Sequence, residues 1–450
     1  MNQNPFLAGA GIVLFWLASA LPIQAQDGRS ATLSAPNCII QVSEPLAAAL
    51  GAQVIDRVSP VRDVILKADI YGTGHTVGKV AVEFVPCADM AVLDLVMTGR
   101  TNSCTTGYRG PVQVHNTGVV DLCARKRVCI DADGIHFCPA WATDRLYSTL
   151  QCITTSFENP VLDRAVRKMA LRKYYKNEDL ATRISESHIA GWTQDDFNKD
   201  ADPQLLAANR DYREKLRQPL EKRGLFPEQL ALRTTTAMLD VLLRFSESNI
   251  PALAPPPKPA ADAEASIRVH ESVLDAGASK LFAGKTYTPA RLMKDLSDLL
   301  GVSMSLPGME EEEPDKFSIT FAEQRPIENH FDNNTVRLVI RGTKYKAEGE
   351  DYDAMNIILS FRLDRTATGI LVTPAKEVDV VAPGKEKLSG SQRRFRAILN
   401  NHLREVLQEP IDVDEIPLPA SLKITAKLVP VQAETSQGWL VLGIRRGNNP

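Results

Sequence analysis

Val80-Ala-Val-Glu-Phe84 and Leu93-Asp-Leu-Val-Met97 place an apolar side chain at every second position. This alternation predicts two β-strands that each bury one face, because successive side chains of a strand point to opposite sides. The alternation recurs over residues 62–138, where short clusters of Gly, Pro, Asn and Asp separate the runs. The other runs are Val64/Leu66/Ala68/Ile70, Val112/Val114 and Val120/Leu122. The pattern predicts an antiparallel meander with one buried face.

Helical patterns flank this meander. Residues 39–57 suit an N-terminal helix, and from about 160 to 223 apolar residues recur at helical spacing.

Tyr71-Gly-Thr-Gly-His-Thr-Val-Gly78 is glycine-rich, with the spacing G-x-G-x-x-x-G. A phosphate cradle needs backbone amides at a helix N-terminus, whereas strands are predicted on both sides here. We therefore expect a β-turn or bulge at this place.

A proline-rich stretch over residues 250–265 predicts a semi-rigid extended linker between two α+β domains, 26–249 and 266–450. The second domain opens with a helix over Val273–Phe282, followed by a short one over Ala290–Leu300. Four alternating runs then predict strands, and an apolar stripe predicts an amphipathic helix from near Ser391. The runs are Phe317/Ile319/Phe321, Val336/Leu338/Ile340, Ile357/Leu359/Phe361/Leu363 and Ile370/Val372, and the final strands are Leu422–Leu428 and Trp439–Ile444.

The predicted fold class is α+β, with each half an antiparallel meander packed against long amphipathic helices. Both halves place the meander first, then an amphipathic helix, then a proline-marked extended segment. This shared order predicts an internal duplication, although any α+β chain could imitate it. A strand set and a helix can each bury one apolar face, which explains why they would pack together.

Composition excludes some classes of protein. The chain has 450 residues, of which 44% are hydrophobic, so it can bury sizeable cores. Its 52 basic and 55 acidic residues give a net charge of -3. No global field would attract nucleic acid, so we expect no nucleic-acid partner.

The N-terminus is typical of an exported protein. Phe6–Pro22 is an uncharged apolar run, small residues follow at Ala20 and Ala25, and polarity rises from Gln26. This predicts a signal peptide over residues 1–25, with the mature protein in the periplasm, the cell envelope or outside the cell. An uncleaved anchor is the alternative, because residues 1–5 lack the usual Lys or Arg. After signal removal we expect no transmembrane span.

The seven cysteines lie in the first third of the chain, and an exported protein meets an oxidising environment. The Asp133-Gly134 dipeptide is typical of a two-residue hairpin turn. A turn there would place Cys129 opposite Cys138 at a non-hydrogen-bonded site, which favours a disulfide between them. The other disulfide candidates, without an assigned pairing, are Cys87, Cys104, Cys123 and Cys152.

Motifs for metals, cofactors and catalysis are incomplete. His136 and Cys138 lie near two other cysteines, but the short ligand spacings of structural zinc sites are absent. His270-Glu271 begins like the zinc-protease helix, yet Leu274 stands where the second histidine is needed. We therefore expect no metal and no cofactor, and nominate no catalytic residue. Six basic residues over 161–176 indicate either a solvated helix face or a surface for an anionic partner or lipid headgroups.

Two resemblances add to this reading. Thr98-Gly-Arg-Thr101, Gly107-Tyr-Arg-Gly-Pro-Val112, Val269-His-Glu-Ser-Val273 and Gly438-Trp-Leu-Val-Leu442 resemble segments of uncharacterised exported bacterial proteins and import no known catalytic residue. The order of helix, meander, amphipathic helix and final strands also resembles tubular lipid-binding (BPI-like) domains. In those domains a curved antiparallel sheet wraps a long helix around an apolar groove. This second resemblance implies lipid binding.

Together these observations predict a non-catalytic exported or envelope protein. We expect it to bind an apolar ligand such as a lipid, or an envelope protein partner, in a groove between helix and sheet. The alternative is an exported hydrolase whose site assembles from distant residues around His115 or His136. A purely structural role in the envelope is a third interpretation. Apolar periodicity cannot separate groove-lining residues from core residues, because both repeat in the same way.

Overall fold

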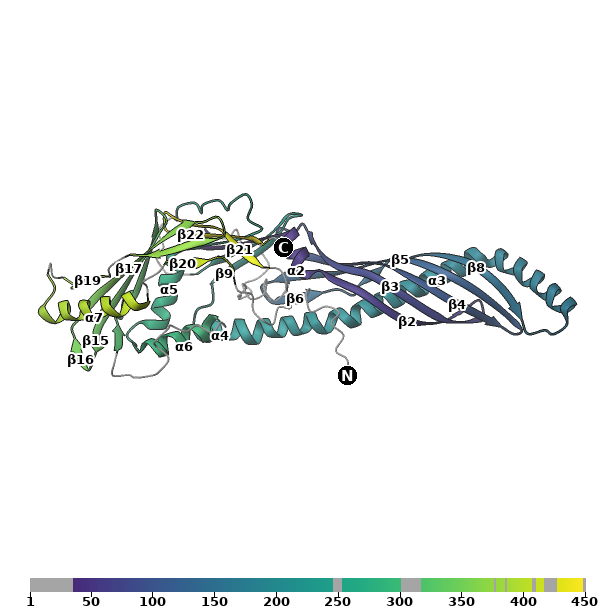
Figure 1. Cartoon of the computed structure of the whole chain (residues 1–450), viewed down its shortest axis with the longest axis horizontal. Helices are drawn as coiled ribbons and strands as arrows, with labels where there is room; N and C mark the ends of the chain where they lie inside the picture. The colour runs from purple at the N-terminus through teal and green to yellow at the C-terminus, as the bar shows by residue number, and fades with distance from the viewer. Residues whose placement is uncertain are drawn as a thin grey trace.

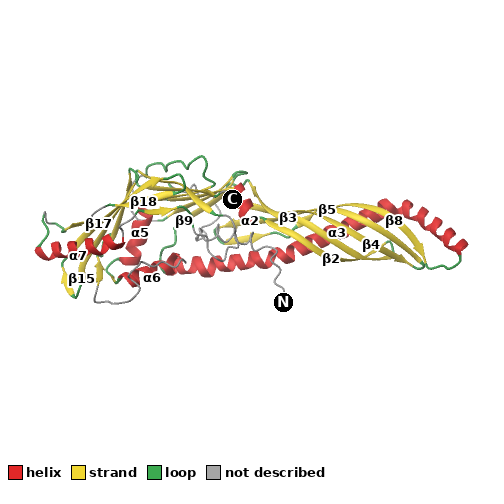
Figure 2. Ribbon diagram, in the orientation of Figure 1, coloured by secondary structure: helices red, strands yellow, loops and turns green. Residues whose placement is uncertain are grey.

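The computed structural model describes residues 35–245, 253–300, 317–375, 378–384, 387–406, 410–416 and 427–447. The molecule is elongated, with one curved sheet at each end and a third sheet between them (Figure 1). A single long helix runs along one side from the far tip of the first sheet toward the middle (Figure 2). The predicted α+β class with antiparallel sheets is confirmed.

The first sheet is the predicted meander. Its order is β2-β3-β4-β5-β6, with β7 and β8 also paired to β5, and all neighbouring strands are antiparallel. The strands are β2 (Gln53–Ile65), β3 (Ala68–Val85), β4 (Ala91–Arg109), β5 (Val112–Asp131), β6 (Gly134–Phe137), β7 (Trp141–Ala142) and β8 (Arg145–Thr155). At about 3.4 Å per residue, the longest strands span roughly 60 Å.

Two expectations inside this meander are wrong. The apolar run around Leu66 is not one strand, because Leu66 and Lys67 adopt φ values of 50° and 64° and form a two-residue turn between β2 and β3. Residues 71–78 form no turn, because β3 passes straight through them. A glycine is needed there for close approach of β4: a Cβ on Gly72 would lie 2.1 Å from the carbonyl oxygen of Cys104.

The hairpin after β5 turns one residue earlier than predicted. Asp131 pairs with Gly134, so Cys129 lies opposite His136 and not opposite Cys138. The Asp131 carboxylate accepts a hydrogen bond from the amide two residues on, which stabilises the turn at this position. The two cysteines become diagonal neighbours, typically about 7–8 Å apart and near the upper limit for a disulfide. All seven cysteines are free thiols in the structure, and the disulfide stays a prediction.

The N-terminal helix expected over 39–57 is shorter than predicted. Residues Cys38–Ser43 form strand β1, helix α2 covers Glu44–Gly51, and β2 begins at Gln53. The hydroxyl of Ser43 caps the helix by accepting from the amide of Leu46. The apolar residues before this cap pair with strands of the central sheet and so cannot join the helix.

The long helix predicted from residue 160 is confirmed as α3 (Pro160–Asp211). Asn159 caps it, and proline at the first helical position is compatible with helix initiation. A π-helical turn over Tyr212–Arg217 and the short helix α4 (Gln218–Lys222) continue it. Among the described residues no helix is long and apolar enough to cross a membrane.

The central sheet takes three strands from each side of residues 250–265. Its order is β21-β22-β11-β1-β10-β9, and β1 pairs with β11 at the middle. The remaining strands are β9 (Gln229–Thr234), β10 (Met238–Arg244), β11 (Ala265–His270), β21 (Leu428–Ser436) and β22 (Trp439–Arg446). Of the strand expected over Leu422–Leu428, residues 422–426 lie outside the described part, and Leu428 is the first residue of β21.

The described part of the proline-rich segment packs on this central sheet. Residues 253–264 form no helix or strand. The indole nitrogen of Trp439 donates to the carbonyl of Ala254 at 2.9 Å, and the amide of Ala260 donates to Gln432 Oε1 at 2.6 Å. The predicted domain limits, 26–249 and 266–450, stay a prediction.

The third sheet contains the predicted strands of the second half. Helices α5 (Glu271–Phe282), α6 (Pro289–Leu300) and α7 (Gly390–Val406) accompany it. The aromatic ring of Phe395 on α7 is fully buried and lies 4.9 Å from the ring of Tyr345. The strands are β12 (Thr286–Tyr287), β13 (Phe317–Phe321), β14 (Ile327–Asp332), β15 (Thr335–Ala347), β16 (Glu350–Tyr352), β17 (Met355–Arg365), β18 (Ile370–Pro374), β19 (Asp379–Val381) and β20 (Ile411–Val413).

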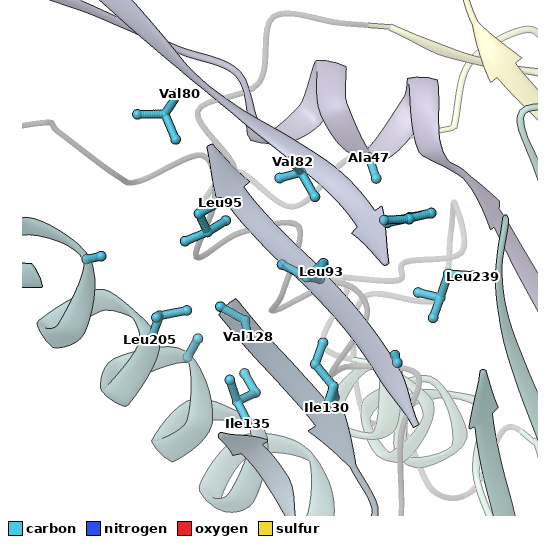
Figure 3. Close-up of a cluster of buried hydrophobic side chains, with 14 of the residues drawn as sticks. Ala47, Val80, Val82, Leu93, Leu95, Val128, Ile130, Ile135, Leu205 and Leu239 are labelled. Atoms are coloured by element: carbon cyan, nitrogen blue, oxygen red, sulfur yellow. The ribbon is translucent and has the colours of Figure 1, made fainter. Parts of the chain in front are cut away.

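The largest core lies where the first sheet meets the central sheet. Val82 of β3, Leu93 of β4 and Val128 of β5 point toward Leu205 of α3, and Leu239 of the central sheet joins the same cluster (Figure 3). These five side chains are at most 3% exposed. This core fixes the second half of α3 against the sheet. Residues 1–34, including the predicted signal peptide, lie outside the described part.

Candidate functional site

Helix α3 fills the gap between the two edges of the curled first sheet. At one edge, Arg57 of β2 forms an ion pair with Asp196 at 2.8 Å. At the opposite edge, the backbone amide of Leu146 in β8 donates to the carboxylate of Glu186 at 3.0 Å. The helix is thereby attached to both β2 and β8. Sheet and helix together enclose a tube.

A second polar contact holds the β2 edge. The ring nitrogen Nδ1 of His188 lies 2.9 Å from the carboxylate of Asp63. On the β8 side, the hydroxyl of Thr193 donates to Asp144 at 2.7 Å. Burial raises the pKa of the Asp144 carboxyl, although that hydrogen bond opposes the shift. The tube is therefore closed by side-chain contacts along both edges.

Two cavities lie between the sheet and α3. The first has a volume of about 680 Å³ and the second about 420 Å³, both within the usual range for small-molecule sites. Six residues line both cavities, which makes them two parts of one groove. These shared residues are Ile65, Ile70, Asn116, Leu146, Ser148 and Ser185.

The groove is long. Along α3 its lining extends from Val166 to Asp200. At 1.5 Å per residue of helix this is roughly 50 Å. The hydrocarbon core of a bilayer is about 30 Å thick, so the groove exceeds the length of two opposed lipid tails. An elongated ligand fits this shape better than a compact one.

The lining is mostly apolar but carries many small and hydroxyl-bearing residues. Its apolar side chains come from every wall, and glycines stand at inward positions where a core would place larger groups. The principal apolar members are Ile55, Val61, Ile65, Ile70, Val80, Met97, Val114, Val120, Leu122, Leu146, Val166, Ile189 and Trp192. The glycines of the lining are Gly74, Gly99, Gly107 and Gly118. These small residues leave the space that forms the groove.

Two buried polar groups of the lining differ in how they are paired: Asn116 has an unsatisfied oxygen, and Asp200 lies 4.0 Å from the guanidinium of Arg57. The buried amide oxygen Oδ1 of Asn116 has no hydrogen-bond partner among the described residues, and Asn116 lies where the two cavities meet. At the inner end, burial raises the pKa of the Asp200 carboxyl, against the opposing effect of Arg57. A buried acceptor without a donor costs about 1–3 kcal/mol, so Asn116 is ready to accept from a ligand.

Neither of the two histidines considered for a hydrolase site is part of the side-chain arrangement that such a site needs. The ring nitrogens of His115 bond to the hydroxyls of Thr106 and Thr154, at 3.0 and 3.1 Å. It therefore lacks the carboxylate contact that orients a catalytic histidine. His136 contacts Asp131 at 3.1 Å on an exposed part of the hairpin. Neither histidine lines the groove.

The remaining sequence motifs have structural roles or no assigned one. His270 caps α5, where its Nδ1 accepts from the amide of Ser272. Within the described ranges, no group of three or more His, Cys, Asp or Glu residues is placed to hold a metal ion. The disulfide candidates Cys87, Cys104, Cys123 and Cys152 are free thiols.

Sequence reasoning predicted a groove between helix and sheet but named none of its residues. The available signal was the presence of Gly, Ser and Thr at inward positions of strands, as at Gly74 and Ser148. In the sequence alone such glycines indicate turns, as the segment Tyr71–Gly78 does. Inward orientation became clear only once the strand registers were known.

Two solved structures resemble this chain at low sequence identity. No family model matches the chain, and no curated protein sequence matches it. One solved structure, a lipopolysaccharide binding protein, matches with a TM-score of 0.35 and 12% identity over 92% of this chain and 99% of that chain. P47 of Clostridium botulinum E1 matches with a TM-score of 0.24 and 8% identity over the same shares.

Proposed function

We propose that this protein binds an elongated lipid, without catalysis, in the groove between α3 and the first sheet. The observation that carries the proposal is the continuity of two cavities along roughly 50 Å of helix. A lipid tail needs an apolar wall, which the aliphatic residues of β2, β3, β5 and β8 supply. Burying that surface would provide the driving force, at about 25 cal/mol per Å² of apolar area.

The polar groups of the groove suit a ligand with a polar portion. Asn116 offers an unpaired acceptor at the junction of the two cavities. Ser148 and Ser185 line the same junction. A lipid hydroxyl or amide placed there would donate to Asn116 and relieve its unsatisfied oxygen.

We also infer that the protein acts after export and that its halves are structural repeats. Export is supported by the apolar run Phe6–Pro22. The repeat is supported by the central sheet, in which β9-β10-β1 and β21-β22-β11 follow the same order from either edge. Each half also places an initial strand and helix before its meander.

A groove-blocking substitution tests the lipid proposal. Ser148→Trp would insert an indole at the junction, whereas Thr149→Trp places the same group on the exposed face of β8. Titration with a fluorescent fatty acid and a fluorescent phospholipid measures Kd for each variant. We expect Ser148→Trp to raise Kd at least about fivefold, because overpacking costs about 1–3 kcal/mol.

Thr149→Trp is the matched control and should bind as the wild type does. Size-exclusion chromatography and circular dichroism establish that both variants are folded. Equal Kd values for all three proteins would contradict a ligand site in the groove. If the wild type bound neither probe, the proposal that the ligand is a lipid would be contradicted.

A further inference from the structure

The first turns of α3 form a basic surface at one end of the molecule. We call residues 160–176 the tip segment. Over 161–176 it contains six basic residues and one acidic residue, Asp163, in a chain whose net charge is -3. The basic residues, all exposed, are Arg164, Arg167, Lys168, Arg172, Lys173 and Lys176.

The acidic residue of the tip segment is already engaged. The carboxylate of Asp163 accepts from the hydroxyl of Thr155 at 2.6 Å and pairs with Arg167, also at 2.6 Å. These contacts lower the pKa of its carboxyl, the Thr155 hydrogen bond being the larger cause. Within the segment the positive charge is therefore opposed by a single carboxylate, which Arg167 already pairs. Glu158 precedes the segment, and Glu178 and Asp179 follow it.

The same segment exposes large apolar side chains. Val161 is 78% exposed, Met169 65% and Tyr175 60%. Leu162 and Leu171 are also exposed. Single exposed apolar residues are ordinary, but five on four and a half turns of one basic helix form an unpartnered apolar and cationic surface.

The tip segment stands at the mouth of the groove. Val166, Met169 and Lys173 line the second cavity on the side of the tip. The turns at the ends of β2 and β4 lie at the same place, where Arg109 donates to the carbonyl of Leu66 at 3.0 Å. Figure 2 shows the start of α3 at the far end of the molecule, beside the ends of these strands.

We propose that the tip segment docks on an anionic lipid membrane surface, with the mouth of the groove facing the headgroups. Basic residues are attracted to anionic lipids, while exposed Leu, Val, Met and Tyr side chains enter the boundary between headgroups and acyl chains. Nucleic acid would satisfy the charges but leave the apolar side chains in water, so the mixture favours a membrane. This proposal goes beyond lipid binding in the groove and does not require the groove to be filled.

Vesicle co-sedimentation tests the docking. The full mature chain is mixed with vesicles of phosphatidylcholine alone or of phosphatidylcholine with phosphatidylglycerol. The tip variant is Lys168→Glu with Arg172→Glu. The matched control is Arg393→Glu with Arg396→Glu on α7, two exposed residues at the opposite end of the molecule with the same change of charge (Figure 1).

Wild type is expected to bind the anionic vesicles and not the neutral ones, with affinity falling as salt screens the charges. Each basic residue near an anionic surface contributes about fivefold to binding, so the tip variant should bind at least about 25-fold more weakly. The α7 control should bind within about twofold of wild type. Leu162→Ser with Met169→Ser, which keeps every charge, should also weaken binding.

Three results would overturn the docking proposal. They are equal binding by the tip variant and the wild type, an equal loss in the α7 control, and no preference of the wild type for anionic vesicles. Ser148→Trp separates this proposal from the groove proposal, because it blocks the groove and leaves the tip unchanged. Docking predicts that Ser148→Trp binds anionic vesicles as wild type does, and a loss there comparable to that of the tip variant would contradict docking by the tip.

Discussion

Two stretches of helix α3 face the first sheet, and they fill the space between helix and sheet in different ways. Residues 201–208 of α3 press Ala201, Leu205 and Ala208 into the core against β3, β4 and β5, and all three are at most 6% exposed. Residues 166–200 face the same sheet farther along, and there the groove remains open. The difference lies in the size of the side chains that the sheet and the helix each place between them.

The comparison shows how one sheet can form a packed core with the helix at one end and an open groove at the other. Near the central sheet, inward positions carry Val82, Leu93 and Leu95, which close on the helix. Toward the tip, the inward positions include Gly74 and Gly118, too small to reach it. Protein interiors pack closely, so a run of small inward residues leaves a gap that is kept open only if the walls are held elsewhere. The contacts of α3 with the edge strands β2 and β8 hold these walls in place.

The largest expected effect comes from creating a cavity in the packed stretch. Leu205→Ala should lower the free energy of unfolding by about 2–5 kcal/mol, because the fully buried side chain leaves a void. Ile189→Ala, on the groove stretch, should cost only about 1 kcal/mol, since that side chain already borders open space. Urea unfolding followed by circular dichroism measures both.

Similar losses of unfolding free energy for Leu205→Ala and Ile189→Ala would contradict the difference between the two stretches. Such a result would mean that the groove stretch is packed as tightly as the core in solution. A ligand that fills the groove could also produce it, so both variants should be measured after delipidation. Under those conditions the contrast depends on the protein alone.

A smaller effect is expected from the buried carboxylate in the groove stretch. Burial raises the pKa of Asp200 above the usual 3.8 of an aspartate, so the folded state holds this proton more tightly than the unfolded state. This contribution to stability therefore declines as the pH rises from about 4 through the raised pKa. Asp200→Asn should increase the free energy of unfolding at neutral pH, by less than Leu205→Ala decreases it. Urea unfolding at several pH values should show the advantage of Asp200→Asn shrinking toward pH 4, and an advantage independent of pH would contradict this origin.

Much of the fold followed from periodicity. Alternating runs such as Val80/Val82/Phe84 predicted strands, and the helical spacing after residue 160 predicted α3. The errors came from turns and pairing. Leu66-Lys67 forms a hairpin turn without the Asn-Gly or Asp-Gly chemistry that marks such turns, and β1 and β11 of the central sheet pair although they lie more than 200 residues apart in the chain. Long-range pairing leaves no local signal.

The site was less predictable than the fold. Ile70 lines the groove and Val82 fills the core, yet both occupy alternate positions of the same strand β3. What separates them is the size of residues on neighbouring strands and on α3, which depends on register. The basic run over 161–176 was visible in the sequence, but its place at the mouth of the groove was not.

The central claim is that the groove holds a lipid. The most direct measurement is mass spectrometry of an organic extract from the purified exported protein, beside extracts from Ser148→Trp and from an unrelated exported control. The account predicts one lipid class enriched near one molecule per wild-type chain and depleted in Ser148→Trp. The claim would be contradicted if the extracts of wild type and of Ser148→Trp both matched the control and the protein took up no added lipid.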